Sequence, residues 1–254
     1  MKSLKNWFLV LSVLSCFGCS SPVHEDGRGC AFVSDSIQYR VEFMSEGCVR
    51  ILSFPEGDTL VTKRLVVDSQ KPAFKDYKWK DTGQQLIFST RELSVAFDKE
   101  DAAFTFQEVS TGKLLLKEKE AKKARHFKRS VTGGEQCLEV TQRFVPTDDE
   151  AIYGLGQYQN GIMNYRGKSV LLLQANMDIV NPFLISTNGY GILWDNYSST
   201  KFEDTKEGYS FTSEVGDASD YYFVYGKNMD EVVAGYRELT GDVPMFGKWV
   251  YGFW

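Results

Sequence analysis

Histidine is the scarcest functional residue of this 254-residue chain, which has only His24 and His126. A Ser-His-Asp or Cys-His catalytic system needs a histidine that the folded core holds in place. A histidine-rich metal centre needs several. His24 lies in a polar N-terminal stretch and His126 in a run of charges, so we expect neither kind of site.

Cysteine is also sparse: the chain has five, and those beyond the N-terminal leader form no C-x-x-C pair. A structural zinc site is therefore not expected. Three cysteines, Cys30, Cys48 and Cys137, lie beyond the N-terminal leader. An odd number leaves at least one thiol unpaired, and the sequence assigns no disulfide. We interpret all three as small core or surface residues.

Phosphate-binding and nucleic-acid-binding features are missing as well. The chain has no G-x-x-x-x-G-K-[ST] loop, and Gly154-Leu155-Gly156 lacks the third glycine of a dinucleotide fingerprint. The formal net charge of −5 gives no reason to expect nucleic acid as a partner. The most basic stretch, residues 117–129, has mixed signs, and we interpret it as a solvated hairpin or loop. We expect no cofactor and no metal.

The N-terminus has the features of an export signal. Lys2 and Lys5 precede an apolar run over residues 7–14, which is too short to span a membrane. Cys16 and Cys19 follow, in a setting that resembles a bacterial lipoprotein cleavage box. We favour Cys19 as the lipidated residue, with Cys16 and a plain secretory signal as alternatives. Residues 1–19 would then be the signal and 20–34 a tether in the cell envelope, with membrane contact only through this anchor.

Short alternating segments dominate the rest of the chain and predict strands. Apolar residues alternate with polar ones over residues 37–43 and 93–97, and turn residues such as Thr111-Gly112-Lys113 separate the segments. Continuous apolar runs such as Tyr190 to Trp194 indicate strands buried on both faces. Many short strands with regular turns predict an all-β fold, a large two-sheet β-sandwich over residues 35–242.

One α-helix is expected near the C-terminus of this sandwich. Asn228 and Glu231 have capping-box spacing, and Gly241 with Pro244 ends the segment. An apolar stripe at helical spacing should pack on the sandwich; it consists of Met229, Val232, Val233, Tyr236 and Leu239. The aromatic segment 243–254 that follows is predicted to be a further strand.

Glycoside cleavage by two carboxyl groups is the chemistry that the composition leaves open. Asp178 lies in a polar loop with Asn176 and Asn181, and we take these three residues as candidate substrate contacts. Asp195 follows Trp194, and its position after a strand favours a turn aspartate that bonds its own backbone. No pair of carboxylates stands out as catalytic.

The second half of the chain resembles the N-terminal domain of glycoside hydrolase family 31, the α-glucosidase and α-xylosidase family. Five segments carry the resemblance in this order: Ala151 to Gln157, Asn181 to Ser186, Gly189 to Tyr197, Tyr236 to Gly241, and Trp249 to Trp254. The resemblance implies a galactose-mutarotase-like sandwich ahead of a (β/α)8 barrel, with residues 243–254 as the first barrel strand. The family's aspartate nucleophile, in a Trp-x-Asp-Met-Asn-Glu type of motif, does not occur here, so we assign no catalytic residue.

The resemblance also implies a role for the loop from Asn176 to Asn181, because a sandwich loop of the family reaches over the barrel mouth. Gln157, where glutamate is commoner, favours an α-xyloside over an α-glucoside as the substrate. Together with a missing barrel, the chain would belong to a retaining α-glycosidase and would be inactive alone. The alternatives are a stand-alone carbohydrate-binding surface lipoprotein, with Trp194 and Tyr197 as stacking faces, and a sugar epimerase.

Overall fold

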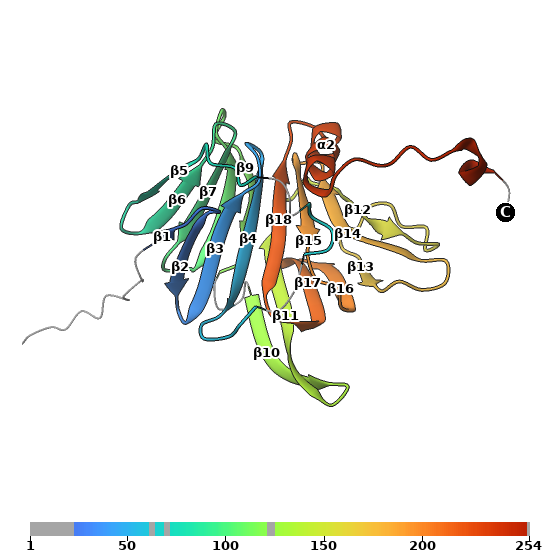
Figure 1. The fold of residues 1–254 in the computed structure, drawn as a ribbon, viewed down its shortest axis with the longest axis horizontal. Coiled ribbons are helices and arrows are strands. Elements are labelled where there is room, and N and C mark those ends of the chain that lie inside the picture. Colours follow the sequence, from blue (N-terminus) through green and yellow to red (C-terminus); the bar gives the residue numbers. More distant parts are fainter. Residues whose placement is uncertain (1–22, 61–63, 69–71, 121–124, 253–254) are drawn as a thin grey trace, which may run out of the picture.

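The computed structural model describes residues 23–60, 64–68, 72–120 and 125–252, and these form a sandwich of two antiparallel sheets (Figure 1). The eight-stranded sheet has the order β1 (His24–Glu25), β2 (Cys30–Ser34), β3 (Ile37–Phe43), β4 (Cys48–Pro55), β18 (Ser219–Tyr225), β15 (Tyr190–Trp194), β14 (Ile179–Ser186) and β12 (Ile152–Gln157). The ten-stranded sheet has the order β13 (Ser169–Leu172), β16 (Thr200–Thr205), β17 (Gly208–Gly216), β11 (Glu135–Val145), β9 (Leu114–Glu118), β8 (Ala103–Glu108), β7 (Leu93–Asp98), β6 (Gln85–Ser89) and β5 (Lys78–Asp81), with β10 (Arg125–Thr132) paired to β11. The predicted fold class is confirmed.

The sandwich begins earlier than its predicted boundary at residue 35. β1 and β2 lie within the segment assigned to a tether, and Cys30 and Phe32 of β2 are buried. Alternation of Cys30 and Phe32 with smaller or polar neighbours is a half-buried strand pattern, which the flanking Gly, Asp and Glu residues conceal. Among the described residues, the first sheet thus begins at His24. The signal segment with Cys16 and Cys19 lies outside the described residues.

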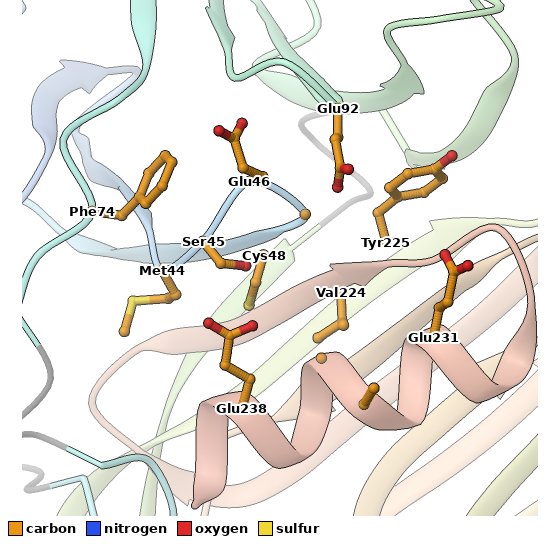
Figure 2. A pocket seen from close by; sticks show the side chains of 13 residues that line it. Met44, Ser45, Glu46, Cys48, Phe74, Glu92, Val224, Tyr225, Glu231 and Glu238 are labelled. Atoms are coloured by element: carbon orange, nitrogen blue, oxygen red, sulfur yellow. The ribbon is translucent and has the colours of Figure 1, made fainter.

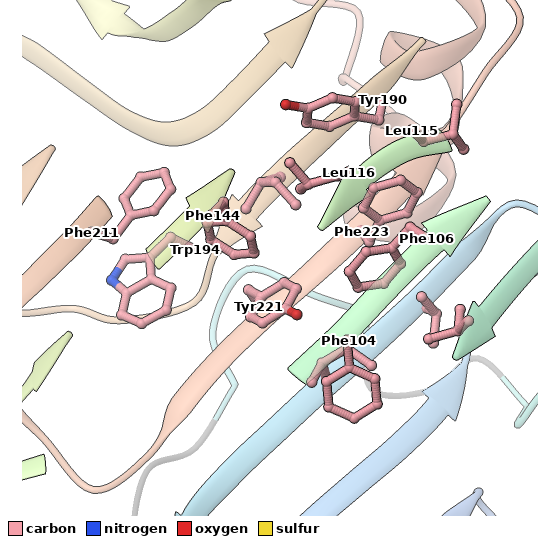
Figure 3. Packing of buried hydrophobic residues seen from close by; sticks show 14 of the residues in the cluster. Phe104, Phe106, Leu115, Leu116, Phe144, Tyr190, Trp194, Phe211, Tyr221 and Phe223 are labelled. Carbon is pink, nitrogen blue, oxygen red and sulfur yellow. The ribbon is translucent and has the colours of Figure 1, made fainter. Parts of the chain in front are cut away.

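Aromatic side chains fill the space between the two sheets (Figure 3). The ring of Phe106 in β8 stacks on that of Phe223 in β18, with centroids 4.2 Å apart. The indole of Trp194 stacks on Phe211, and its Nε1 donates to Ser213 Oγ at 2.9 Å. Large rings at facing positions give a well-filled core, and a buried indole N–H needs the partner that Ser213 provides.

The outer face of the first sheet is covered by the helix α2 (Met229–Thr240). Asn228 Oδ1 accepts from the Glu231 N–H, as the capping-box spacing predicts. The Glu231 carboxylate accepts from the N–H of Lys227, one residue before the cap. Val232 and Leu239 are buried against the sheet, whereas Met229 and Val233 remain more than a third exposed. The predicted apolar stripe is therefore only partly covered.

The segment after α2 does not form the predicted strand. Residues 242–247 are extended without pairing, and Lys248–Tyr251 form the 3₁₀ turn η1. A strand needs a neighbouring backbone to pair with. No other described strand of this chain lies beside the segment, so its strand-like composition has no partner here.

The charged run 117–129 differs from the expected solvated loop at two residues. Glu118, the last residue of β9, is completely buried, and so is nearly all of the Arg125 side chain at the start of β10. The two form an ion pair inside the sandwich. Both residues therefore face the core from strands, although the composition of this run is polar.

Candidate functional site

The loop predicted to contact substrate lies at one end of the sandwich, where β12 and β13 are the open edges of the two sheets (Figure 1). A β-bulge between Gly154 and Gly156 distorts the pairing of β12 with β14. Three successive residues have left-handed φ values, including the buried Leu155 at +65°. A Cβ at Gly156 would lie 2.0 Å from the carbonyl oxygen of Ile179, so only glycine allows this close approach. The bulge therefore shifts the register between β12 and the first residues of β14, which follow the loop.

The loop itself is a tight turn with an apolar tip. The Asp178 N–H donates to the Ala175 carbonyl at 3.2 Å, and Met177 inside the turn has φ of +68°. Gln174 bonds the loop twice: its Nε2 donates to the Asp178 carbonyl at 2.8 Å, and its Oε1 accepts from the Val180 N–H at 3.1 Å. The side chain of Gln174, at the start of the loop, is thus bonded to the backbone at its end.

The three predicted contact residues differ in their surroundings. Asn176 is exposed, whereas Asp178 and Asn181 are half-buried. Burial, followed by the charges of Tyr165 and Asp178, raises the pKa of Tyr158 to about 12. Asn181 Oδ1 accepts from the Tyr236 hydroxyl of α2 at 3.4 Å. The structure places Asn176 and Asp178 in the turn and Asn181 in the adjoining strand β14, and Asn176 is the most accessible of the three.

Met177 and Gln174 were not among the residues selected from the sequence. Met177 is 65% exposed at the tip, and Gln174 is exposed at the base. Their roles depend on a left-handed φ and on side-chain hydrogen bonds to backbone. Neither residue type signals these features, although a polar loop with a central apolar residue is itself unusual.

Trp194 cannot act as an exposed stacking face, because it is completely buried. Tyr197 is 45% exposed, and its hydroxyl accepts from the Leu65 N–H at 2.7 Å. Asp195 is buried as well. Its burial, and then the charge of Asp220, raises the pKa of the Asp195 carboxyl, which a hydrogen bond from Tyr197 partly offsets. The backbone N–H of Asp195 donates to Asp220, in place of the expected bond from its own side chain to a turn.

The described hollow with the most carboxylates lies elsewhere, between α2 and the turn before β4 (Figure 2). It has a volume of about 480 Å³, and Glu46, Glu92, Glu231 and Glu238 surround an apolar floor that includes Val224. Glu46 pairs with Arg91, and Glu231 caps α2. No group of His, Cys, Asp or Glu in the described residues could hold a metal ion. This groove lies on the β4 side of α2, whereas the loop lies on the β14 side.

Neither histidine accompanies the loop. His24 is exposed on β1, the edge of the first sheet opposite to β12, and His126 is exposed on β10. An epimerase would need a histidine acid and a carboxylate base in one cleft. Cys30, Cys48 and Cys137 form no disulfide, and no described helix has the length and apolar character to cross a bilayer.

Solved structures with the same architecture include two α-xylosidases. The GH31 α-xylosidase from Xanthomonas citri matches 91% of this chain with a TM-score of 0.81 and 22% identity, over 42% of its own chain. A GH31 α-xylosidase from a soil metagenome, complexed with xylose, matches 92% with a TM-score of 0.78 and 23% identity, over 36% of its length. At this identity the likeness concerns the fold.

Sequence comparison gives the family. An α-xylosidase from Saccharolobus solfataricus is 34% identical over 234 residues, which are 86% of this chain and 30% of that protein. α-Glucosidase 2 from Bacillus thermoamyloliquefaciens is 27% identical over 88% of this chain and 29% of its own length. The chain thus spans about 30% of these relatives. Residues 38–203 match the model of the glycosyl hydrolase 31 N-terminal galactose mutarotase-like domain. The chain belongs to the glycosyl hydrolase 31 family and contains this N-terminal domain.

Proposed function

We propose that this domain works together with a (β/α)8 catalytic domain of a retaining α-glycosidase and forms part of its substrate pocket. The observation that carries the proposal is the loop from Gln174 to Asn181, which is pre-formed and exposed at one end of the sandwich. Reaction with retention needs two carboxyl groups about 5 Å apart on either side of the glycosidic bond. We place both on the catalytic domain.

Exposed apolar side chains support contact with another domain at this end of the sandwich. They surround the open edges of β12 and β13 and consist of Met163, Leu171, Leu173, Met177 and Ile179. A further set follows α2 and consists of Val243, Met245, Phe246, Trp249 and Tyr251. In Figure 1 the segment after α2 runs toward the same end as β12 and β13. Apolar surface gathered in this way is typical of an interaction site.

An α-xyloside is the substrate that we favour, with an α-glucoside second. Both an α-xylosidase and an α-glucosidase are among the relatives. Gln157 of β12 pairs with Ile179 of β14 at the base of the loop, so the two segments are neighbours in the first sheet. The pocket that Gln157 and the loop border would then accept the smaller sugar.

The test is a polypeptide that joins this chain to the catalytic domain of a family 31 α-xylosidase. Hydrolysis of p-nitrophenyl α-xyloside should exceed that of the α-glucoside, and Asn176→Ala should raise KM more than it lowers kcat. A matched change on the far hairpin, Gln136→Ala, should leave both constants unchanged. An Asn176→Ala enzyme with unchanged KM would contradict a role of the loop in substrate binding.

A stand-alone carbohydrate-binding lipoprotein is the second candidate. The exposed Tyr197 favours it, whereas the burial of Trp194 removes half of the stacking pair that it needs. Under either function we propose export to the cell envelope with lipidation at Cys19. Mass spectrometry of the N-terminal peptide from expressing bacteria would detect the acylated cysteine, and Cys19→Ala should abolish it.

A further inference from the structure

The loop from Gln174 to Val180 contains a conformation that its own residues do not favour. Met177 has φ of +68°, a left-handed value at which the Cβ of an L-residue crowds the following carbonyl group. Glycine or asparagine usually occupies such positions. A non-glycine residue keeps this conformation only where its surroundings hold it, and such residues concentrate at functional sites.

The side chain of Gln174 stabilises this conformation of the turn. Its amide group ties the start of the turn to its end, as donor to the Asp178 carbonyl at 2.8 Å and acceptor from the Val180 N–H at 3.1 Å. The only other described bond across the turn is that from the Asp178 N–H to the Ala175 carbonyl, at 3.2 Å. On the far side, Tyr236 of α2 reaches Asn181. Phe183 stacks on the ring of Tyr236 with centroids 4.3 Å apart, so the base of the loop is fixed while the tip projects outward.

We infer that Gln174 is a positioning residue, which holds Asn176 and Met177 in the sugar-contacting conformation before the ligand arrives. Asp178 contributes mainly its backbone to this arrangement, because its carbonyl and N–H are both used inside the loop. Met177 then offers an apolar surface and Asn176 an amide, a pair suited to the apolar face and the hydroxyl groups of a pyranose. The choice of a sugar as the ligand rests on the proposed function, whereas the role of Gln174 in the turn does not.

Amide hydrogen exchange of this chain, measured residue by residue by NMR, tests the clamp without any ligand. In Gln174→Ala the Val180 amide should exchange about tenfold faster, because its N–H loses the acceptor Gln174 Oε1. The Asp178 amide keeps its bond to Ala175 but should also exchange faster, because the turn loses the bond from Gln174 to the Asp178 carbonyl. Gln174→Glu keeps an acceptor for Val180 and should retain protection there. Gln174→Ala with Met177→Gly should restore protection at Asp178 only, because glycine adopts the left-handed conformation without strain. Gln136→Ala is the matched control.

Titration with methyl α-xylopyranoside of this chain joined to the family 31 catalytic domain, followed by the same amide signals, tests the consequence. We expect shifts at Asn176 to Asp178 and about tenfold weaker binding in Gln174→Ala, with an unchanged thermal midpoint. Unchanged exchange at Val180 and Asp178 in Gln174→Ala would refute the clamp. Faster exchange in that variant, with no sugar-dependent shift in the joined protein that keeps Gln174, would instead refute the proposed function and leave the clamp standing.

Discussion

The ion pair between Glu118 and Arg125 provides a strong test of how the two halves of the sandwich are held together. The side chains are 0% and 3% exposed. Arg125 also donates to Tyr39 at 3.0 Å and to the Ala102 carbonyl at 2.8 Å, and Glu118 accepts from Phe104 and Tyr221. The network therefore links both sheets, since Tyr39 and Tyr221 belong to the first and the pair itself to the second.

Arg125→Met should remove the cation and leave the Glu118 carboxylate buried without a counter-charge. Loss of one partner of a buried pair costs about 3–5 kcal/mol in the free energy of unfolding. For a domain of this size that corresponds to a fall of roughly 6–20 °C in the melting temperature. Denaturation in urea, followed by tryptophan fluorescence, to which the buried Trp194 contributes, measures the change.

Two companion variants separate the buried charge from a general effect of substitution on β10. Arg129→Met, at a side chain that is 74% exposed, should cost no more than about 1 kcal/mol. Glu118→Gln combined with Arg125→Met removes both charges and should cost clearly less than the sum of the single changes. An Arg125→Met protein within about 1 kcal/mol of the wild type, or additive single and double variants, would refute the reasoning.

Three further predictions concern other parts of the chain. Burial raises the pKa of Glu150 despite hydrogen bonds from Tyr190 and Ser186, so this group should lower stability as pH rises above its unfolded pKa of about 4.3. Glu150→Gln should therefore gain stability relative to the wild type between pH 5 and pH 8 in urea midpoints, and parallel pH profiles would contradict this. Gly156→Ala should cost about 1–3 kcal/mol, because its φ is +119° and its Cβ would meet the Ile179 carbonyl, whereas Gly27→Ala meets nothing and should be neutral in thermal denaturation. Tyr236→Phe keeps the stacking on Phe183 and should cost less than about 1 kcal/mol, yet it should shift the Asn181 side-chain amide signals in NMR spectra; unchanged signals would exclude the bond to Asn181.

Strand and helix periodicity made most of the architecture predictable. The alternation over residues 37–43 and the capping box at Asn228 both correspond to elements at the expected places. β2 was missed because its short pattern lies among Gly, Asp and Glu residues that are typical of a linker. The prediction of a strand after α2 was wrong for this chain. The composition of the segment favours strand formation, but a strand forms only where a neighbouring backbone can pair with it.

The candidate site was predictable as a segment but less so as individual residues. The polar composition of residues 174–181 indicated a loop able to present side chains, and the family resemblance gave it a role. Met177 depends on a backbone dihedral and Gln174 on two hydrogen bonds to backbone, and these arise from the conformation of the whole turn. Likewise, Trp194 looked suitable for stacking on a sugar, but its position on a central strand buries it in the core.

The division of labour between this sandwich and a catalytic domain is the central claim, and an activity measurement tests it most directly. The purified chain alone should not hydrolyse p-nitrophenyl α-xyloside or the α-glucoside above the uncatalysed rate, whereas the same chain joined to a family 31 catalytic domain should turn over the xyloside. Turnover by the chain alone that Asp178→Ala abolishes would contradict the account, because it would place the reactive carboxylate in the sandwich.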